Sequence, residues 1–321
     1  MDFTSTSTAP TVQFNSTVSP ALRALLARSI DYAGLFPPAE LPLEPALKNH
    51  ADYLRSDDSW MLSTFVLPTT RFGAAEEQLA IFDRSAPLRI SALGAKTDTP
   101  NDLGAKLPGI FGAIRELQSR HSGVAFVPQL EIVIPAGFDL SLIGDLYRGS
   151  KELGVRVFCE SPAAQAERTI AVLAQVDTTR DFPLGFKLRT GGVTADAFPD
   201  ASLIARALVA SVRDSVPIKF TAGLHHPVRQ YRDEVKGKMY GFLNVLGAGV
   251  MAAEHGWDEA TAVQMLEDED VRSFAFAGDA FSWREWKVSA NRIELHRQRV
   301  TSFGSCSFVE PREDLRALGL L

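Results

Sequence analysis

The chain has little cysteine: only Cys159 and Cys306 occur in 321 residues, without the spacing of a metal finger. Two cysteines are too few for a disulfide framework, so we expect both to pack as buried thiols. No apolar run approaches the roughly 18 residues needed to cross a bilayer. The first twenty residues have neither a cationic start nor an apolar core. The sequence therefore predicts a cytoplasmic protein with no secretory signal and no membrane partner.

Clusters of basic residues are also missing. The 33 lysines and arginines are outnumbered by 39 aspartates and glutamates, which gives a formal net charge of −6. No run of Lys and Arg resembles a patch for a phosphate backbone, so we expect no nucleic-acid partner. The 45% apolar and 22% charged content is that of an ordinary globular protein.

Strand-like and helix-like stretches alternate from residue 30 almost to the end of the chain. Eight strands with helices between them in about 300 residues match a closed (β/α)₈ TIM barrel. The alternative is an open doubly wound sheet, but the glycine-rich fingerprint that would support a dinucleotide-binding sheet is absent. The predicted strands span residues 30–36, 61–67, 88–93, 130–134, 155–160, 184–189, 218–221 and 273–277.

The remaining segments complete the predicted organisation. We expect residues 1–17 to form a disordered leader and residues 18–321 to form a single catalytic domain. A short N-terminal helix is predicted at residues 20–29, and an extra helical segment at 241–269, between strands seven and eight. Residues 283–300 are predicted to form the last helix, followed by a structured closing segment at 302–311.

The most informative residues are two lysines in apolar strands. Lys187 and Lys219 lie 32 residues apart, the length of one strand–helix–strand unit, so their strands are expected to be parallel neighbours. Side chains alternate along a strand, so Lys187 and Arg189 share one face of their strand. Lys219 and Thr221 likewise share one face of theirs. Because the intervening apolar residues suit the helix-covered outer face, both lysines should point into the barrel.

Two ammonium groups close together in a poorly hydrated interior should lower each other's pKa. A neutral amine is a nucleophile that attacks a carbonyl carbon and forms a Schiff base. Glu160, at the end of the fifth strand, is a candidate acid/base or a counter-ion. A purely structural pair, with the lysines balanced by Glu160 or Glu131, is the alternative. The residues alone do not say which lysine would be the nucleophile.

The two lysine motifs, KLRTGG and IKFTAG, resemble strands six and seven of the lysine-dependent class I aldolases, especially the deoxyribose-phosphate aldolases. The resemblance implies that Lys187 is the nucleophile and that Lys219 tunes it, while Thr190 and Gly191 match the end of the first motif. It covers only the two strands. Gly223 is followed by Leu224 and not by a second glycine, so a phosphate-binding role of that loop is in doubt. No residue obviously matches the family's acidic proton relay.

Several other residues are candidates for substrate contacts at the rim. Arg189 with the Gly191-Gly192 turn could hold a carboxylate or phosphate, although these glycines could serve only the turn. Thr221 and Gly223 are expected beside them. Three candidates have a structural alternative: Asp31 as an interior anchor, Arg229 as a surface residue and Asn244 as a cap of a turn.

His225 and His226 directly follow the seventh strand and should also lie on the rim. One of them could act as an acid/base or contact the substrate. A divalent metal is the alternative, with Glu160, Asp31 and Glu131 as further ligands, but no HxH or HExxH spacing supports it.

Together these patterns predict a lyase of the aldolase type, without cofactor or bound metal, that acts on a small anionic carbonyl compound through a lysine Schiff base. A metal-dependent lyase or hydrolase using His225 and His226 is the first alternative. A non-catalytic barrel that binds a small anion is the second. The sequence leaves open whether the chain forms a homo-oligomer.

Overall fold

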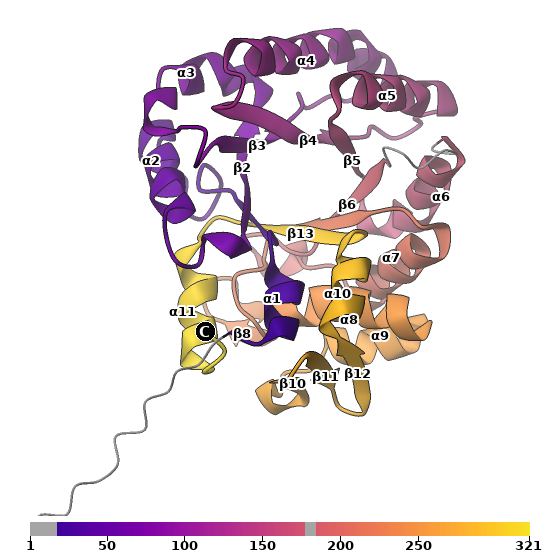
Figure 1. Cartoon of the computed structure of the whole chain (residues 1–321). Helices are drawn as coiled ribbons and strands as arrows, with labels where there is room; N and C mark the ends of the chain where they lie inside the picture. Colours follow the sequence, from indigo (N-terminus) through magenta and orange to yellow (C-terminus); the bar gives the residue numbers. More distant parts are fainter. Residues whose placement is uncertain (1–17, 177–183) are drawn as a thin grey trace, which may run out of the picture.

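The computed structural model describes residues 18–176 and 184–321, and its main feature is a closed barrel of eight parallel strands (Figure 1). The expected disordered leader, residues 1–17, lies outside the described residues. Around the barrel the strand order is β1-β13-β7-β6-β5-β4-β3-β2. The barrel strands are β1 (Ile30–Tyr32), β2 (Leu62–Pro68), β3 (Leu88–Leu93), β4 (Ala125–Val133), β5 (Arg156–Glu160), β6 (Gly185–Arg189), β7 (Ile218–Thr221) and β13 (Val300–Ser305). The (β/α)₈ prediction is confirmed.

Helices cover the outside of this barrel, and local signals explain where they begin and end. For example, Asp139 accepts a hydrogen bond from the backbone N–H of Leu142 and starts a helix that stops at Gly154, in the left-handed conformation. The helices are α1 (Pro20–Leu26), α2 (Leu43–Leu54), α3 (Phe72–Glu76), α4 (Pro100–Arg120), α5 (Leu140–Leu153), α6 (Ala166–Val176), α7 (Ala201–Asp214), α8 (Phe242–His255), α9 (Glu259–Leu266), α10 (Ala290–Arg297) and α11 (Val309–Ala317).

The helical insertion after β7 is present as α8 and α9, as expected. Helix α8 is buried from Phe242 to Ala252 because α7, α9, α10 and β13 all contact it. The ring of Phe242 stacks on that of Phe303, in the last barrel strand, with 5.2 Å between centroids. An apolar helix enclosed on all sides explains why this segment has no polar face. None of the described helices combines the length and apolarity that a bilayer crossing requires.

The prediction that residues 273–277 form the eighth barrel strand is wrong. Those residues form β10 (Phe274–Ala277), which pairs antiparallel with β11 (Ala280–Trp283), and β11 pairs with β12 (Trp286–Ser289), in a separate small sheet. Only residues 290–297 of the predicted last helix are helical, as α10. The eighth barrel strand is β13, in the segment expected to close the chain. Its sequence VTSFGS is rich in small polar residues because Ser302 and Gly304 face the crowded interior.

A second hairpin, β8 (Gln230–Arg232) and β9 (Gly237–Met239), follows β7 on the rim. At the opposite end, α1 and α10 lie in front of the ring of strands in Figure 1. The side chains that line this end include Ser63 and Arg156, which lie at or near the beginnings of their strands, β2 and β5. The barrel therefore has two distinct openings, one at each end of its strands.

Candidate active site

The two lysines lie side by side, as the sequence predicts. Strands β6 and β7 are parallel neighbours, and Lys187 is directly opposite Lys219. Their amines are joined by one carboxylate that the sequence analysis considered only as a counter-ion or metal ligand. Glu131 Oε2 lies 2.6 Å from the Nζ of Lys187. Its Oε1 lies 2.5 Å from the Nζ of Lys219.

Each lysine also has a carboxylate of its own. Glu160 Oε2 is 2.8 Å from Lys187 Nζ, and Asp31 Oδ2 is 2.8 Å from Lys219 Nζ. The order Glu160–Lys187–Glu131–Lys219–Asp31 forms an alternating row across the barrel, here called the lysine–carboxylate chain. No side chain in it is more than 11% exposed. Two cations thus face three anions, and the like charges are separated by opposite ones.

This arrangement corrects the expectation that one amine is held neutral by the other. Burial lowers the pKa of Lys187, but the charges of Glu131 and Glu160 and their hydrogen bonds outweigh it and raise that pKa above 10.5. Burial likewise raises the pKa of Glu131, yet Lys187 and Lys219 together bring it down to about 2. The resting site therefore holds an ammonium at Lys187 beside an ionised Glu131.

Asp31 anchors the inner end of the chain. It accepts hydrogen bonds from Thr64 at 2.5 Å, Ser302 at 2.6 Å and Gln129 at 3.2 Å. Its side chain is 0% exposed. Of its two predicted roles, the interior anchor is confirmed and the position at the rim is wrong. Ser91 similarly donates to Glu131 Oε1 at 2.5 Å, so the shared carboxylate is fixed from below.

A cavity of about 350 Å³ opens over the C-terminal ends of the strands. Lys187 and Glu131 line it, whereas Lys219, with a side chain only 1% exposed, does not. Lys187 is therefore the amine of the pair that a bound molecule can reach. The other predicted site residues on its wall are Arg189, Gly192, Thr221, Gly223 and His225.

Arg189 lies at the mouth of this cavity, with a side chain 56% exposed and Nη1 3.9 Å from Glu160 Oε1. Thr190 and Gly191 do not line it. Thr190 Oγ1 donates to the carbonyl of Ala222 at 2.8 Å, and a Cβ on Gly191 would lie 2.5 Å from the ring of Phe198. These two residues therefore build the rim and do not meet the cavity. Gly223 has a φ of +75°, a conformation that favours glycine.

His225 lies on the cavity wall with Cys306. Its Nδ1 is 3.1 Å from Oε2 of Glu310, in α11, and the Cys306 Sγ is 3.9 Å from both ring nitrogens. Burial lowers the pKa of His225, but the bonds with Cys306 and Glu310 outweigh it and raise that pKa to about 9. His225 therefore adds a positive charge to the cavity at neutral pH.

His226 points elsewhere. Its Nδ1 lies 2.6 Å from Asp314 Oδ2, and it lines a smaller neighbouring cavity of about 170 Å³. The two histidine rings are 6.5 Å apart and are held by different carboxylates. Across residues 18–176 and 184–321, no group of three or more His, Cys, Asp and Glu is arranged to hold a metal ion. The ligand set of the metal alternative thus does not come together.

Arg229 and Asn244 serve the insertion and not the cavity. The backbone N–H of Arg229 donates to Asn244 Oδ1 at 2.9 Å, and Asn244 Nδ2 donates to the carbonyls of Met265 at 2.7 Å and Asp268 at 2.8 Å. The Arg229 guanidinium binds Glu269 at 2.5 Å. Asn244 therefore has its structural alternative, whereas Arg229, with a side chain only 17% exposed, is neither a residue of this cavity nor the expected surface arginine.

Four residues of the site were missed or underrated: Glu131, Ser91, Cys306 and Glu310. Glu131 carried a usable signal, since a charge inside the apolar run LEIVI is as unusual as a lysine inside FKLR. Ser91 meets Glu131 through the pairing of β3 with β4, whereas Cys306 and Glu310 reach His225 only through the closure that β13 and α11 complete.

Comparisons with known proteins add little. No protein-family model matches the chain, and no curated protein does. Among solved structures, a triazine hydrolase from Arthobacter aurescens shares 12% identity at a TM-score of 0.34, over 62% of this chain and 53% of that one. The chain thus spans about half of that protein's length. A similarity this low carries no inference about activity.

Proposed function

We propose that this barrel is a lyase that forms a Schiff base between Lys187 and a small anionic carbonyl compound. The observation that carries the proposal is the position of Lys187. It is the amine of the pair that meets the cavity, and it lies within 2.8 Å of two carboxylates that can take up and return a proton. Fold alone would not justify this, since barrels host many chemistries.

The first step is the loss of a proton from the Lys187 ammonium. Glu131 is a poor acceptor because its pKa is about 2 and Lys219 and Ser91 hold its Oε1. Glu160 has no second lysine, and its nearest other cation is Arg189, at 3.9 Å. Glu160 therefore takes the proton when the substrate displaces water from the cavity.

The neutral amine then attacks the carbonyl carbon and forms a carbinolamine. Glu160 returns its proton to the departing hydroxyl, water leaves, and the C=N bond of an iminium ion forms. Glu131 stays ionised beside this new positive charge and stabilises it as it stabilised the ammonium.

Carbon–carbon cleavage follows from the electron demand of the iminium. A base removes the proton of the substrate's β-hydroxyl, the bond between the two carbons breaks, and its electrons move into an enamine on Lys187. Glu160, ionised again after giving up its proton, is the base. The first carbonyl product leaves, and Glu160 returns the hydroxyl proton to the enamine carbon, which restores the iminium. Water then hydrolyses the iminium, which releases the second carbonyl product and the Lys187 ammonium.

Lys219 acts as a positioning residue in this scheme. It fixes Glu131 Oε1 so that Oε2 faces Lys187, and Asp31 fixes Lys219 in turn. The expected role was to lower the pKa of Lys187 through repulsion between like charges. The role proposed here differs because the Glu131 carboxylate lies between the two ammonium groups.

The wall of the cavity supports an anionic substrate. Arg189 and the charged form of His225 line it together with Lys187, and the acid on this wall, Glu131, is already bound to lysine. Glu160, also bound to Lys187, lines a neighbouring cavity instead. A volume of about 350 Å³ suits a small molecule. A guanidinium at the mouth would bind a carboxylate or phosphate at the substrate's far end.

Borohydride trapping tests the proposal. The protein is incubated with a panel of 2-oxo acids and aldehydes, reduced, and examined by intact mass and peptide mapping. We expect a secondary amine at Lys187, absent in Lys187→Met and retained in the surface control Lys151→Met. Absence of any adduct across the panel, together with catalytic activity retained in Lys187→Met, would contradict the Schiff-base proposal.

A further inference from the structure

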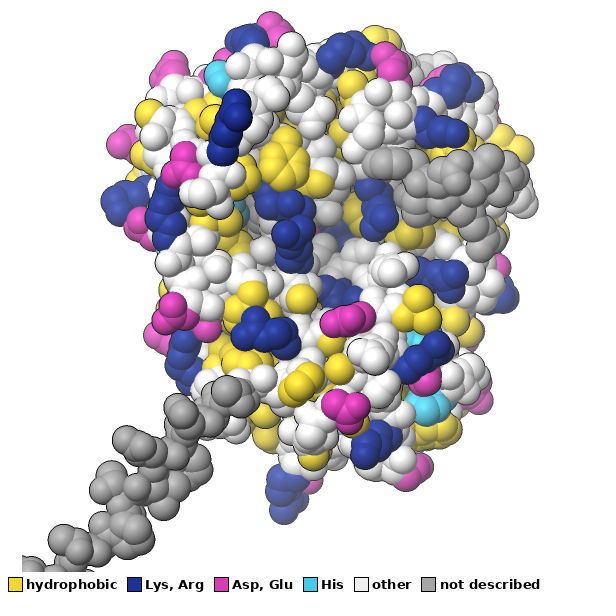
Figure 2. Space-filling model, viewed as in Figure 1, with side chains coloured by type: hydrophobic (Ala, Val, Ile, Leu, Met, Phe, Trp, Pro, Cys, Tyr) yellow, Lys and Arg dark blue, Asp and Glu magenta, His cyan; other side chains and the backbone are white. Residues whose placement is uncertain are grey.

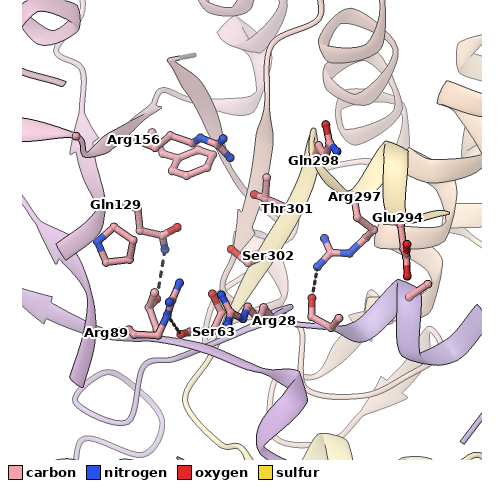
Figure 3. A pocket seen from close by; sticks show the side chains of 16 residues that line it. Arg28, Ser63, Arg89, Gln129, Arg156, Glu294, Arg297, Gln298, Thr301 and Ser302 are labelled. Atoms are coloured by element: carbon pink, nitrogen blue, oxygen red, sulfur yellow. Dashed lines mark hydrogen bonds between the residues drawn. The ribbon is translucent and has the colours of Figure 1, made fainter. Parts of the chain in front are cut away.

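The opposite end of the barrel has a larger cavity, of about 800 Å³, whose wall carries four arginines and a single acidic residue, Glu294. The arginines are Arg28, Arg89, Arg156 and Arg297, and they define what is here called the arginine cavity (Figure 3). They come from four separate segments: the turn after α1, strand β3, the start of β5 and the end of α10. The face of the molecule on this side is hollowed near its centre, and dark blue side chains border the hollow (Figure 2).

These guanidinium groups have few partners. Within the described part of the chain, the side chains of Arg28 and Arg156 make no hydrogen bond or ion pair, and Glu294 makes no ion pair with any of the four. Arg89 donates from Nε to the carbonyl of Ser63 at 3.2 Å. Each arginine has five N–H donors, so most of the donors around this cavity are unused.

Arg297, which is more enclosed, also has an N–H donor without an acceptor. Its two terminal nitrogens donate to backbone carbonyls, of Val300 and, at 3.0 Å, of Ala27, while its buried Nε has no partner in the described structure. Burial lowers its pKa to about 10, with Asp31 opposing the shift. Burial also lowers the pKa of Arg156 and of Arg89, and the charge of Arg28 adds to the effect on Arg89.

The nearest buried acid cannot neutralise this charge. Asp31 lies just inside the cavity floor, where Thr64, Gln129 and Ser302 bind it, but Lys219 holds it at 2.8 Å. Three of the four cations are thus partly desolvated, close to one another and without a carboxylate of their own. Such a cluster gains most from an anion with several charged oxygens, since guanidinium groups bind phosphate through paired N–H donors.

From this geometry we propose that the arginine cavity binds a small phosphate-bearing molecule, at a site separate from the lysine–carboxylate chain. The cavity is large enough to hold an organic group beside the phosphate, and the apolar atoms of Ala24, Pro128 and Phe158 supply a surface for it. The proposal does not depend on the Schiff-base chemistry, because binding is measured directly.

Calorimetric titration of the full chain tests the proposed phosphate site. The two probes are inorganic pyrophosphate and adenosine monophosphate, and the ionic strength is kept constant. We expect saturable binding of at least one probe, with a rise in melting temperature as the probe concentration increases. Arg28→Glu and Arg156→Met should each weaken binding by about tenfold or more. Arg168→Glu, an exposed arginine on α6, is the matched control and should change binding less than about twofold.

The two probes separate the sources of affinity. Binding of pyrophosphate as tight as that of the nucleotide assigns recognition to the phosphate oxygens, whereas tighter binding of the nucleotide adds the apolar surface. Arg28 is exposed and makes no side-chain bond in the described chain, so its replacement is expected to leave folding intact even if Arg156→Met fails to fold. No binding of either probe, or binding equal in Arg28→Glu and Arg168→Glu, would overturn the proposal.

Discussion

The two ends of the barrel handle positive charge in opposite ways. Toward the C-terminal end, Lys187 and Lys219 are each held by two carboxylate oxygens at 2.8 Å or less. At the N-terminal end, the arginine cavity has four cations and one acid that pairs with none of them in the described chain. Charges balanced within the protein are suited to moving protons, whereas charges left unbalanced are suited to recruiting an anion from outside.

The largest effect expected from this comparison is at Glu131. Glu131→Gln leaves two buried ammonium groups without their shared anion, so we expect a loss of about 3–5 kcal/mol of unfolding free energy, measured in urea. Glu152→Gln breaks an exposed pair with Arg115 and should cost less than about 1 kcal/mol. Equal stability of the two variants would show that the lysines are not held by Glu131.

The next effect concerns Lys219. Lys219→Met leaves Asp31 buried with only neutral donors, and we expect a loss of about 3 kcal/mol or more. The double variant Lys219→Met/Asp31→Asn removes both charges and should recover part of that loss, with a coupling of about 1–3 kcal/mol in a double-mutant cycle. Additive effects of the two substitutions would contradict a direct ion pair.

The pH dependence of stability offers a smaller effect. The pKa of His225 is raised from 6.5 to about 9, so its contribution is fully present below pH 6.5 and is lost as the pH rises through about 9. Because one pKa unit corresponds to 1.36 kcal/mol, we expect a fall of about 1–3 kcal/mol between pH 6 and pH 10. His225→Gln should flatten this part of the curve measured by urea unfolding. If the unfolding free energy of His225→Gln fell with pH as steeply as that of the unchanged protein, a group other than His225 would be responsible.

The smallest effect is expected in the arginine cavity. The charge of Arg28 helps to lower the pKa of Arg89, and the Arg28 side chain has no partner in the described chain. Arg28→Gln should therefore change the unfolding free energy by less than about 0.5 kcal/mol, with any gain visible at low salt. A loss of more than about 1 kcal/mol would mean that this cation is balanced after all, and the contrast between the two ends would fail.

Sequence reasoning predicted the barrel and the lysine pair because both leave local signals. Apolar runs of strand length identify parallel strands, and a lysine within such a run is costly enough to be conspicuous. It missed β13, because an interior face filled by Ser302 and Gly304 makes a barrel strand read as a loop, while the apolar FAFA of β10 reads as a better strand.

The charge state of the lysines also could not be predicted from the sequence. The expectation of a neutral amine considered two ammonium groups alone, and the answer depends on where Glu131 sits between them. That position follows from the register of β4 against β5 and of β5 against β6, where Glu160 is opposite Lys187. Similarly, the arginines at the other end are far apart along the chain and come together only when the barrel closes.

A crystal structure of the protein after borohydride reduction with a trapped carbonyl compound tests the central claim most directly. We expect continuous electron density from the Nζ of Lys187 into the cavity above it, with Lys219 still bound to Glu131 and Asp31. Density joining the ligand to Lys219 or to a surface lysine, with the Lys187 amine unmodified, would contradict the account.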